Sequence, residues 1–532
     1  MSKQVRTLII VLAVIAVLGG SLAALLLIPR AGEDSSSGAS ATASSDPGIS
    51  LIDKSKDADG KSVEHPVKKA VLKTGDREEE KDEDGEITTP AYAGEEFSLI
   101  LNDEEDLVID LYADLSVGAS SAVNTLSSNL AAITASKKIA DDPEDPSIYG
   151  FDTPRAVVTV TYHDDTTYSF ELGDETPLKE GYYFREQGKS TVYMVSTSFG
   201  NTVSQGSLNY VGTTLYSAPS VESDDDSGQA ILRDMKLSGR SYAQSFAFRA
   251  TTTDDGSDVS FSPFVLTSPY RRMTDSNVME SYAALTSLSA SKAVVVNPTA
   301  EQLKTYGFDD PFSVAELNLA VKTTEKVKDE DDKEVDKTKY YNVRPHTVTL
   351  GNKNNDGNYY CMVDDVPVVY LVSASSVPWA TLQYDDAAGN QLFMKDITTV
   401  DKVIVKANGA ETVFQLEHFP DADSNDDKMK VTVGDKTYST PNFRTLYQWL
   451  MTIKRLGPVE TDSAGDPILE VELVPVDERD AGISAKIYYA TASSYNCVMG
   501  SGESYRVSAD SVDRAVAQLE KYLAGEDLEK IY

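Results

Sequence analysis

The residue types that most often carry out chemistry are few in this 532-residue chain, and their spacing completes no catalytic motif. The sequence contains neither His-Glu-x-x-His nor Cys-x-x-Cys, the short spacings typical of zinc ligands. Ser289–Lys292 and Lys73–Gly75 match two motifs of penicillin-binding enzymes, but in the reversed order. The four histidines are far apart: His65, His163, His346 and His418. We therefore predict a protein that is not an enzyme, with no catalytic, metal-binding or cofactor-binding residues.

One loop has the spacing of a calcium site. Asn352, Asn354 and Asp356, followed by Gly357, match the first half of an EF-hand loop, but the twelfth position is Val363 instead of glutamate. Asn-Asp-Gly is also a favoured sequence for a tight turn between two strands. We expect a turn here, with weak binding of cations at the surface as the alternative.

Two tyrosine pairs are the candidate binding residues: Tyr182, Tyr183, Tyr359 and Tyr360. Tyrosine is common in strands because it suits a surface that is half buried. The favoured interpretation is therefore that both pairs determine the fold. The alternative is that they form a recurring aromatic surface that holds a ligand.

Both tyrosine pairs belong to a longer pattern that occurs twice. Tyr149–Pro154 reads Tyr-Gly-Phe-Asp-Thr-Pro, and Tyr306–Pro311 reads Tyr-Gly-Phe-Asp-Asp-Pro. After each come alternating apolar residues, a Leu-Gly step, the tyrosine pair and a Tyr-x-Val-Ser ending. The Leu-Gly steps and endings are Leu172-Gly173 with Tyr193–Ser198 and Leu350-Gly351 with Tyr370–Ser375. Such regular recurrence predicts repeated structural units.

A third, degenerate copy closes the chain. Tyr505–Asp510 repeats the ending, but the Tyr-Gly-Phe part is missing. The second copy is longer than the first by the charged stretch Lys322–Lys339, which we expect to be an extended hairpin or a loop insertion. In the two complete copies, Gly150 and Gly307 are expected to have positive φ at the end of a helix.

Apolar residues at helical spacing lie ahead of each copy. They are Val123, Leu126, Leu130 and Ile133; Val278, Tyr282, Leu285 and Leu288; and Phe443, Leu446, Leu450 and Ile453. Strand pairs such as Met235–Ala250 and Val400–Glu417 precede them. The serine of each Val-Ser ending suits a helix N-cap, and a final helix is predicted over Val512–Leu523. The predicted fold class is α+β: an N-terminal transmembrane helix, then three repeated units of antiparallel sheet plus helix.

The turn, the Leu-Gly step and the Tyr-x-Val-Ser ending together resemble the bacterial family called "domain of unknown function 4340". The resemblance covers residues 120–230 and 278–380 well, and the C-terminal part faintly. It implies an anchored envelope protein that is often encoded beside components of ABC transporters, including ones that resemble gliding-motility transporters. No catalytic or binding residues are established for the family, so the resemblance assigns none.

The charge of the chain excludes some partners. A formal net charge of −37 argues against nucleic acid, whose phosphates require Lys and Arg, and against docking of the body onto anionic lipid. The two cysteines, Cys361 and Cys497, are too few for a disulfide framework. They lie at corresponding positions of different copies, so we expect two separate thiols, with one disulfide as the alternative.

The N-terminus has the features of a membrane anchor. Leu8–Ile28 is uncharged and follows Lys3 and Arg6, and its length suffices to cross a bilayer as a helix. Positive charges ahead of it predict a cytoplasmic N-terminus and a body outside the cytoplasm. A cleaved signal peptide is the alternative.

The predicted organisation has five parts. They are a membrane anchor (1–30), a flexible stalk (31–62) rich in Ser, Ala and Gly, and three units at 63–222, 228–390 and 391–532. We predict a single-pass extracytoplasmic accessory or scaffold protein, in contact with membrane lipid through Leu8–Ile28 and associated with the permease or ATPase of an ABC-type transporter. The alternative is a binding module for envelope polysaccharide or peptide.

Overall fold

The computed structural model describes residues 48–531 except 82–86, 90, 257, 329–331 and 478–479. The predicted membrane segment Leu8–Ile28 and the first part of the predicted stalk lie outside these residues. Within the part of the chain that is described, no helix is both long enough and apolar enough to cross a membrane.

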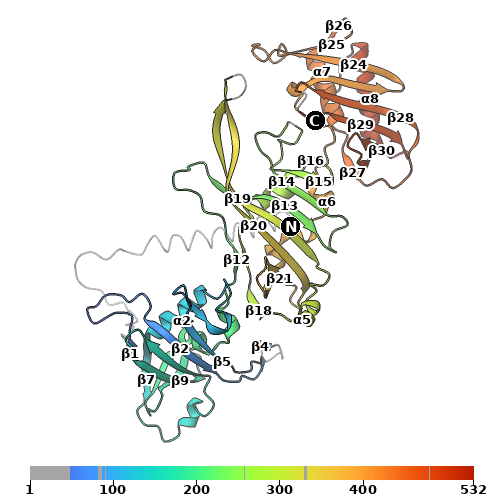
Figure 1. Ribbon diagram of the computed structural model, residues 1–532. Helices are drawn as coiled ribbons and strands as arrows, with labels where there is room; N and C mark the ends of the chain where they lie inside the picture. Colours follow the sequence, from blue (N-terminus) through green and yellow to red (C-terminus); the bar gives the residue numbers. More distant parts are fainter. Residues whose placement is uncertain are drawn as a thin grey trace, which may run out of the picture. The chain divides into compact units, whose positions relative to one another are not determined.

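Most of the described chain forms three antiparallel sheets of nine strands each (Figure 1). In spatial order, the first sheet contains β1 (Ile49–Asp53), β7 (Ala132–Ala140), β11 (Val192–Ser196), β10 (Gly181–Glu186), β9 (Thr167–Glu175), β8 (Ala156–Tyr162), β2 (Val67–Thr74), β5 (Glu96–Leu101) and β6 (Leu107–Ile109). A small pair, β3 (Glu80–Lys81) and β4 (Ile87–Thr89), lies in the β2–β5 connection.

The second and third sheets follow in the sequence. In spatial order, the second contains β16 (Arg272–Met273), β15 (Phe264–Ser268), β14 (Phe246–Ala250), β13 (Gln229–Ser238), β19 (Ser313–Lys328), β20 (Glu334–Lys353), β21 (Tyr359–Val363), β22 (Val368–Val372) and β18 (Lys292–Val296). The third contains β26 (Lys436–Tyr438), β25 (Met429–Val433), β24 (Ala410–His418), β23 (Val400–Ala407), β28 (Ala464–Pro475), β29 (Ile483–Tyr489), β30 (Ser494–Met499), β31 (Ser504–Ser508) and β27 (Arg455–Gly457).

All three sheets share one topology. A strand near the middle (β2, β13 or β23) pairs on one side with the strand that follows it in its sheet and on the other with the first strand of a four-stranded meander. The strand just before the meander (β7, β18 or β27) pairs with the last strand of that meander. The third unit therefore has the same strand order as the second, although its sequence lacks the Tyr-Gly-Phe turn. The first sheet differs at its edges, where β1 is added beside β7 and two strands instead of three lie beyond β2.

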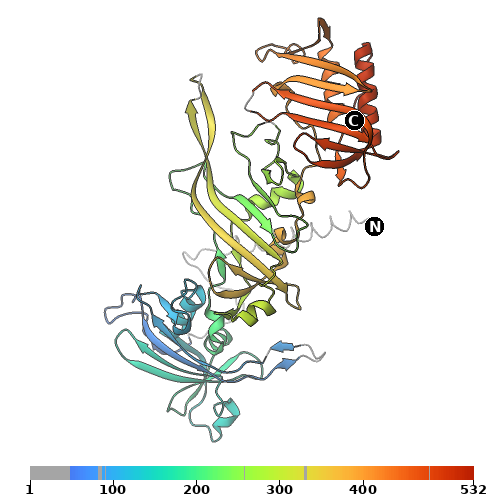
Figure 2. The ribbon, with the colours of Figure 1, turned by 45° about the vertical axis from the view of Figure 1, so that its right-hand side comes forward.

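Helices cover one face of each sheet. They are α2 (Ser121–Ala131) and α3 (Thr197–Ser204) in the first unit, α4 (Ser276–Met279) and α6 (Tyr384–Ala387) in the second, and α7 (Thr440–Met451) and α8 (Ala509–Ala524) in the third. The second unit also contains α5 (Ala300–Thr305), which buries no side chain and leads into the Tyr-Gly-Phe turn. The two helices of the third unit are the longest of these, and Figure 2 shows them beside the sheet. Short 3-10 turns complete the units: η1 (Asp110–Tyr112), η2 (Pro146–Tyr149), η3 (Ser207–Tyr210), η4 (Glu280–Ala284), η5 (Ala374–Ser376), η6 (Pro378–Thr381) and η7 (Ile397–Thr399).

The serines of the three Val-Ser endings begin the segments that follow, as predicted. The side chains of Ser196, Ser373 and Ser508 each accept a hydrogen bond from a backbone N–H in the next turn. The expected final helix is α8, and the expected hairpin is the long β19–β20 ladder, which continues to the pair Lys328–Glu334. These local predictions are confirmed. The sequence was sufficient for them because each feature depends on residues that are close together in the chain.

The predicted fold class is wrong in its balance of helix and strand. The described chain is mostly antiparallel sheet, and several apolar sets at helical spacing are divided between short helices and strands. Ile133 lies in β7, after α2 has ended. Leu288 lies in β17 (Leu288–Ser289), which pairs with β12 (Thr214–Tyr216). Pairing with a strand from elsewhere in the chain outweighs the local preference for helix at these positions.

One strand lies where a flexible stalk was predicted. β1 (Ile49–Asp53) pairs with β7 at the edge of the first sheet, so the stalk prediction is wrong for these residues. Leu51 and Ile52 are half buried there and pack against the core. An available sheet edge orders a short apolar stretch that composition alone predicts to be disordered.

Candidate functional site

The Tyr-Gly-Phe turn lies against the second strand of the meander in the first and second units. Gly150 and Gly307 have φ angles of 77° and 84°, as predicted. A Cβ atom at Gly173 would lie 2.0 Å from the carbonyl oxygen of the turn's tyrosine, and one at Gly351 would lie 2.1 Å from its counterpart. The Leu-Gly step therefore permits the turn to pack directly on the strand.

The first tyrosine of each candidate pair lies in the core. Tyr182 is 6% exposed and Tyr359 is 2% exposed. The hydroxyl of Tyr182 donates a hydrogen bond to Oδ1 of Asn201 at 2.7 Å. These two residues therefore do not form the aromatic binding surface considered from the sequence.

The second tyrosine of each pair is half buried and lies on the opposite face of its strand. Its partner is the tyrosine of the turn. The ring centroids of Tyr183 and Tyr149 are 4.8 Å apart, and those of Tyr360 and Tyr306 are 4.4 Å apart. Each of the first two units therefore carries one partly exposed aromatic pair, at the same position of the repeat.

A cleft of about 780 Å³ lies beside Tyr360. One wall consists of Tyr360, Lys292 on β18 and the segment Asn352–Asp356. The other wall comes from η3, which packs against β18 and contributes Leu208 and Asn209. Tyr183, the equivalent of Tyr360 in the first unit, does not line this cleft. The structure thus distinguishes two residues that the repeat makes equivalent.

The Asn-x-Asn-x-Asp-Gly segment of this cleft is a turn, as predicted. Oδ1 of Asn354 accepts hydrogen bonds from the backbone N–H groups of Asp356 at 3.1 Å and Asn358 at 2.9 Å. Oδ1 of Asn352 accepts one from Arg240 at 2.8 Å. Oδ2 of Asp356 accepts one from the side chain of Asn354 at 3.0 Å, so all three side chains of the calcium motif already accept hydrogen bonds.

Two lysines face the cleft without a carboxylate partner. Lys292 and Lys353 are exposed, and neither forms an ion pair within the described residues. The ammonium group of Lys353 lies 4.6 Å from the ring centroid of Tyr359, at the distance of a cation–π contact. Tyr359, although buried, therefore supports one of the charged groups of the cleft.

A second cluster of chemically capable residues joins the second and third units. We call it the clasp, and it consists of Arg272, Tyr384, Asp385, Arg455, Glu503 and Tyr505. Arg272 of β16 donates to the hydroxyl of Tyr505 at 2.5 Å, and its Nη1 lies 3.5 Å from Oε1 of Glu503. From the third unit to the second, Arg455 of β27 donates a hydrogen bond to Asp385 of α6. Each unit thus supplies a cation to a carboxylate of the other.

The carboxylate of the clasp is buried and well hydrogen-bonded. Glu503 is 5% exposed and accepts hydrogen bonds from Tyr505 at 2.6 Å, Tyr384 at 3.0 Å and Ser501 at 3.0 Å. Both arginines also lie over the ring of Tyr505, with guanidinium-to-centroid distances of 5.0 and 5.3 Å. Burial, together with the hydrogen bond to Glu503, raises the pKa of Tyr505 to about 12. All charges of the clasp are compensated, so its chemistry suits joining two units.

The cysteines and two of the histidines are buried or hydrogen-bonded within the fold. Cys361 and Cys497 are both free and buried, so the prediction of two separate thiols is confirmed. Burial raises the pKa of the Cys497 thiol to about 12. His346 lies 2.9 Å from Asp364, and His418 lies 2.7 Å from a backbone oxygen of Val400. Among the described residues, no group of three or more His, Cys, Asp or Glu is arranged to hold a metal ion.

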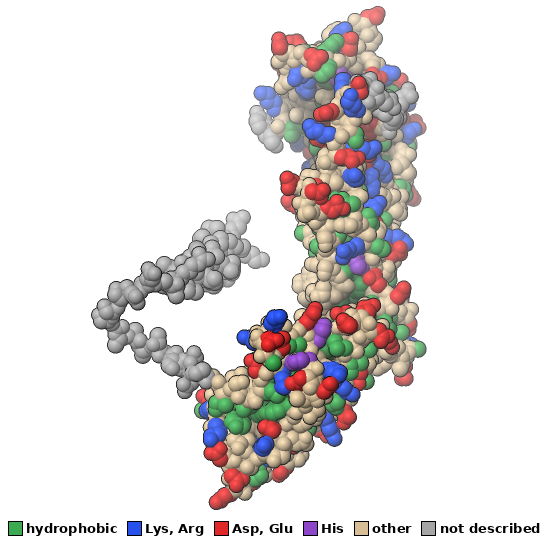
Figure 3. Space-filling view, turned by 60° about the vertical axis from the view of Figure 1, so that its left-hand side comes forward, with side chains coloured by type: hydrophobic (Ala, Val, Ile, Leu, Met, Phe, Trp, Pro, Cys, Tyr) green, Lys and Arg blue, Asp and Glu red, His purple; other side chains and the backbone are tan. Residues whose placement is uncertain are grey.

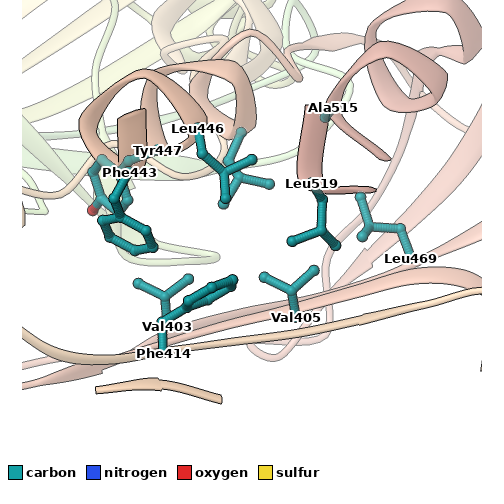
Figure 4. A pocket seen from close by; sticks show the side chains of 10 residues that line it. Val403, Val405, Phe414, Phe443, Leu446, Tyr447, Leu469, Ala515 and Leu519 are labelled. Atoms are coloured by element: carbon teal, nitrogen blue, oxygen red, sulfur yellow. The ribbon is translucent and has the colours of Figure 1, made fainter. Parts of the chain in front are cut away.

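A small apolar void in the third unit belongs to the core. It lies between α7, α8 and the sheet, and its volume of about 10 Å³ is close to that of a single water-sized probe. Figure 4 shows that Phe414, Phe443 and Leu519 point into it. It is packing space between helices and sheet, too small for a ligand.

Reasoning from the sequence did not identify the clasp or the two lysines. Glu503 lies two residues before Tyr505, and the equivalent positions in the other copies are Thr191 and Val368. Because no carboxylate recurs at this position, the repeat did not indicate that Glu503 is special. In the sequence, Lys292 is distinguished only as the lysine of the Ser-x-x-Lys match Ser289–Lys292. Both sets depend on which elements meet in space.

Comparison with known proteins gives one family match. A family model described as "Domain of unknown function (DUF4340)" matches residues 109–243 and 265–456. These stretches include the meanders of the first and second units and end before the third meander, β28–β31. No curated protein and no solved structure matches the chain.

Proposed function

This chain belongs to the family described as domain of unknown function (DUF4340), and from this membership we propose that it is a non-catalytic accessory or scaffold protein of an ABC-type transporter complex. In the proposal, the apolar segment Leu8–Ile28 holds the chain at the membrane, and the residues after it lie outside the cytoplasm. Lys3 and Arg6 ahead of this segment support that orientation. The transporter association rests on the usual genetic context of the family.

The observation that carries the scaffold role is the threefold use of one topology. Each unit buries one face of its sheet beneath helices and leaves the other face open, so three similar units in series provide a large surface for protein contact. The recurring glycines and Tyr182 and Tyr359 serve the fold within each unit. The repeats therefore offer a partner three surfaces of similar shape, and each surface carries a different set of side chains.

The surface itself suits contact with proteins more than with polyanions. Acidic and basic side chains are interspersed on the face shown in Figure 3, while the chain as a whole has a net charge of −37. Such a surface repels nucleic acid and anionic lipid. A protein partner can instead meet it with local pairs of opposite charge.

The test is affinity purification of the tagged full-length chain from detergent-solubilised native membranes, followed by mass spectrometry. We expect a permease or ATPase subunit of an ABC transporter to be recovered with it, and to be absent when an unrelated tagged single-pass protein is purified in the same way. Recovery of the chain without any transporter subunit, under detergent conditions that keep the transporter itself assembled, would refute the proposed association.

A further inference from the structure

We propose that one edge of the first unit is the place where this chain contacts the permease of the transporter. We call this edge the β7 surface, and it consists of Lys137, Ile148, Leu178 and Tyr183. The inference rests on the proposed transporter association and adds the site of contact to it. Two observations carry it: the way in which each unit receives the unit before it, and the exposure of Ile148 and Leu178.

Successive units join at equivalent places. In the second unit, η3, which ends the first unit, packs against β18. In the third unit, the equivalent strand is β27, and Arg455 of this strand binds the segment that ends the second unit. Its guanidinium group donates to the backbone oxygen of Ala388 at 3.0 Å, and its backbone N–H donates to that of Asn390 at 2.8 Å. The strand before each meander is therefore where a unit receives its predecessor.

The equivalent strand of the first unit is β7, and no unit precedes it among the described residues. Its neighbours in the sheet are β11 and β1. β1 pairs only with Ala132–Ala135, so no described strand pairs with the outer edge of the remaining part of β7. The position that a preceding unit occupies elsewhere is thus open here.

The β7 surface matches the wall of the second unit that faces η3 across the cleft beside Tyr360. The equivalent parts are Lys137 and Lys292, Ile148 and Thr305, Tyr183 and Tyr360, and the meander turns 176–180 and 354–358. Leu208 of η3 lines the opposite side of that cleft. The repeat therefore shows what this kind of surface accepts, which is a short helical turn of a neighbouring folded unit.

Contacts within the first unit hold the β7 surface together. Lys137 lies 3.6 Å from Glu180, which places the turn that carries Leu178 beside β7. A Cβ atom at Gly150, two residues after Ile148, would lie 2.5 Å from Cγ of Asp174 at the start of the same turn. Ile148 and Leu178 therefore lie at one edge of the unit.

The two apolar residues of this surface are unusually exposed. Leu178 is 79% exposed and Ile148 is 66% exposed, the highest values for large apolar side chains in the described part of the chain. The corresponding turn of the second unit is polar, and Thr305 stands in place of Ile148. Exposed apolar side chains with paired charges beside them are typical of a protein interface, with its apolar centre and polar rim.

The occupant we expect is a membrane protein, because the β7 surface is tethered near the membrane. β1, which pairs with β7, begins at Ile49, and twenty residues separate it from Ile28 at the end of the predicted anchor. A fully extended chain of this length spans roughly 70 Å. The permease is the transporter subunit that crosses the membrane, so we expect it to contribute an apolar side chain from a short extracytoplasmic helical turn, as η3 contributes Leu208.

Photo-crosslinking in native membranes tests the contact. Benzoylphenylalanine is introduced at position 178 of the tagged full-length chain, and for comparison at position 111. Leu111 is 52% exposed and follows β6, at the opposite edge of the same sheet. We expect a crosslink to the permease from position 178 and none from position 111. A crosslink from position 178 to a second copy of the chain, to lipid alone or to a different protein would overturn the proposal.

Matched variants separate this inference from the transporter association. Ile148→Glu combined with Leu178→Glu should lower the recovery of the permease in affinity purification roughly tenfold or more. Leu111→Glu combined with Val476→Glu, at positions 52% and 57% exposed, should leave recovery unchanged. Chemical unfolding should be the same for both pairs, since all four side chains are exposed. Undiminished recovery with the first pair would overturn the β7 surface and leave the transporter association standing, whereas absence of the permease from the wild-type purification would overturn both.

Discussion

The glycine of each Leu-Gly step lies against the carbonyl oxygen of a tyrosine from the preceding turn. That oxygen would be 2.1 Å from a Cβ atom at Gly351 and 2.0 Å from one at Gly173, so neither position accepts a side chain without displacing backbone. The same turn brings its tyrosine ring onto the second tyrosine of the pair. At the scale of single residues, the Tyr-Gly-Phe turn, the Leu-Gly step and the tyrosine pair therefore pack together at one place in each of the first two units.

Replacing Gly351 by alanine should destabilise the second unit. We expect the free energy of unfolding to fall by about 3 kcal/mol, because the new methyl group must push the Tyr306 backbone away from β20. The measurement is chemical unfolding of the full-length chain, followed by tyrosine and tryptophan fluorescence.

Gly188→Ala is the matched control for this change. Gly188 has a φ of +80°, but no atom lies within 4 Å of the position that a Cβ would take there. The substitution should therefore cost only the strain of a left-handed residue, about 1 kcal/mol. Equal losses for the two variants would contradict the close contact at Gly351.

At the scale of elements, a serine at the end of the last meander strand, or directly after it, begins the next helical segment. The same Val-Ser ending is followed by α3 (Thr197–Ser204) in the first unit, by the short η5 (Ala374–Ser376) in the second, and by α8 (Ala509–Ala524) in the third. The cap is thus constant while the helix length varies. The side chains that follow the cap, and the sheet face they cover, decide how far the helix continues.

Removing the cap of α8 should have a measurable cost. Ser508→Ala should lower the free energy of unfolding by about 1 kcal/mol, because the hydroxyl that accepts from the Ser511 N–H is lost. Ser128→Ala, an exposed serine within α2, should change it little, since alanine is the better helix former. A loss for Ser128→Ala as large as that for Ser508→Ala would show that the cap contributes nothing of its own.

At the scale of the whole molecule, the clasp joins the second and third units through buried polar groups. The side chains of Arg272 and Glu503 are 9% and 5% exposed, and Arg455 is 9% exposed. A buried ion pair adds little stability relative to an apolar contact of the same shape, but breaking it by removing one partner is costly. The clasp therefore acts mainly to specify how these two units join.

Glu503→Gln should uncouple the third unit from the second. We expect a loss of about 3 kcal/mol, since Arg272 keeps its buried charge without a carboxylate. Hydrogen exchange read by mass spectrometry should show faster exchange on both sides of the junction, in β16 and α6 as well as in β31.

An exposed pair serves as the control for the clasp. Asp510 and Arg514 of α8 form an ion pair with side chains 71% and 59% exposed, so Asp510→Asn should cost at most about 0.5 kcal/mol. Unchanged exchange at the junction in Glu503→Gln would mean that packing alone joins the two units.

Local features of this protein follow from its sequence. The repeated motif, the positive φ angles of Gly150 and Gly307, the serine caps, the strand pairs and the long charged hairpin all depend on residues close together in the chain, so spacing and residue type are enough to predict them. The family membership follows from the same motif. The two separate thiols were also predictable, because corresponding positions of different repeats lie in different sheets.

Other features were decided only by the tertiary structure, because they depend on which distant elements meet. Ile133 and Leu288 joined strands, although their spacing favoured helix, and β1 formed on an edge that composition did not reveal. The tyrosine pairs were divided by the alternation of side chains along a strand, with Tyr182 and Tyr359 inside and Tyr183 and Tyr360 outside. Glu503 and Arg272, far apart in the sequence, formed a buried pair because the third unit lies against the edge strand of the second.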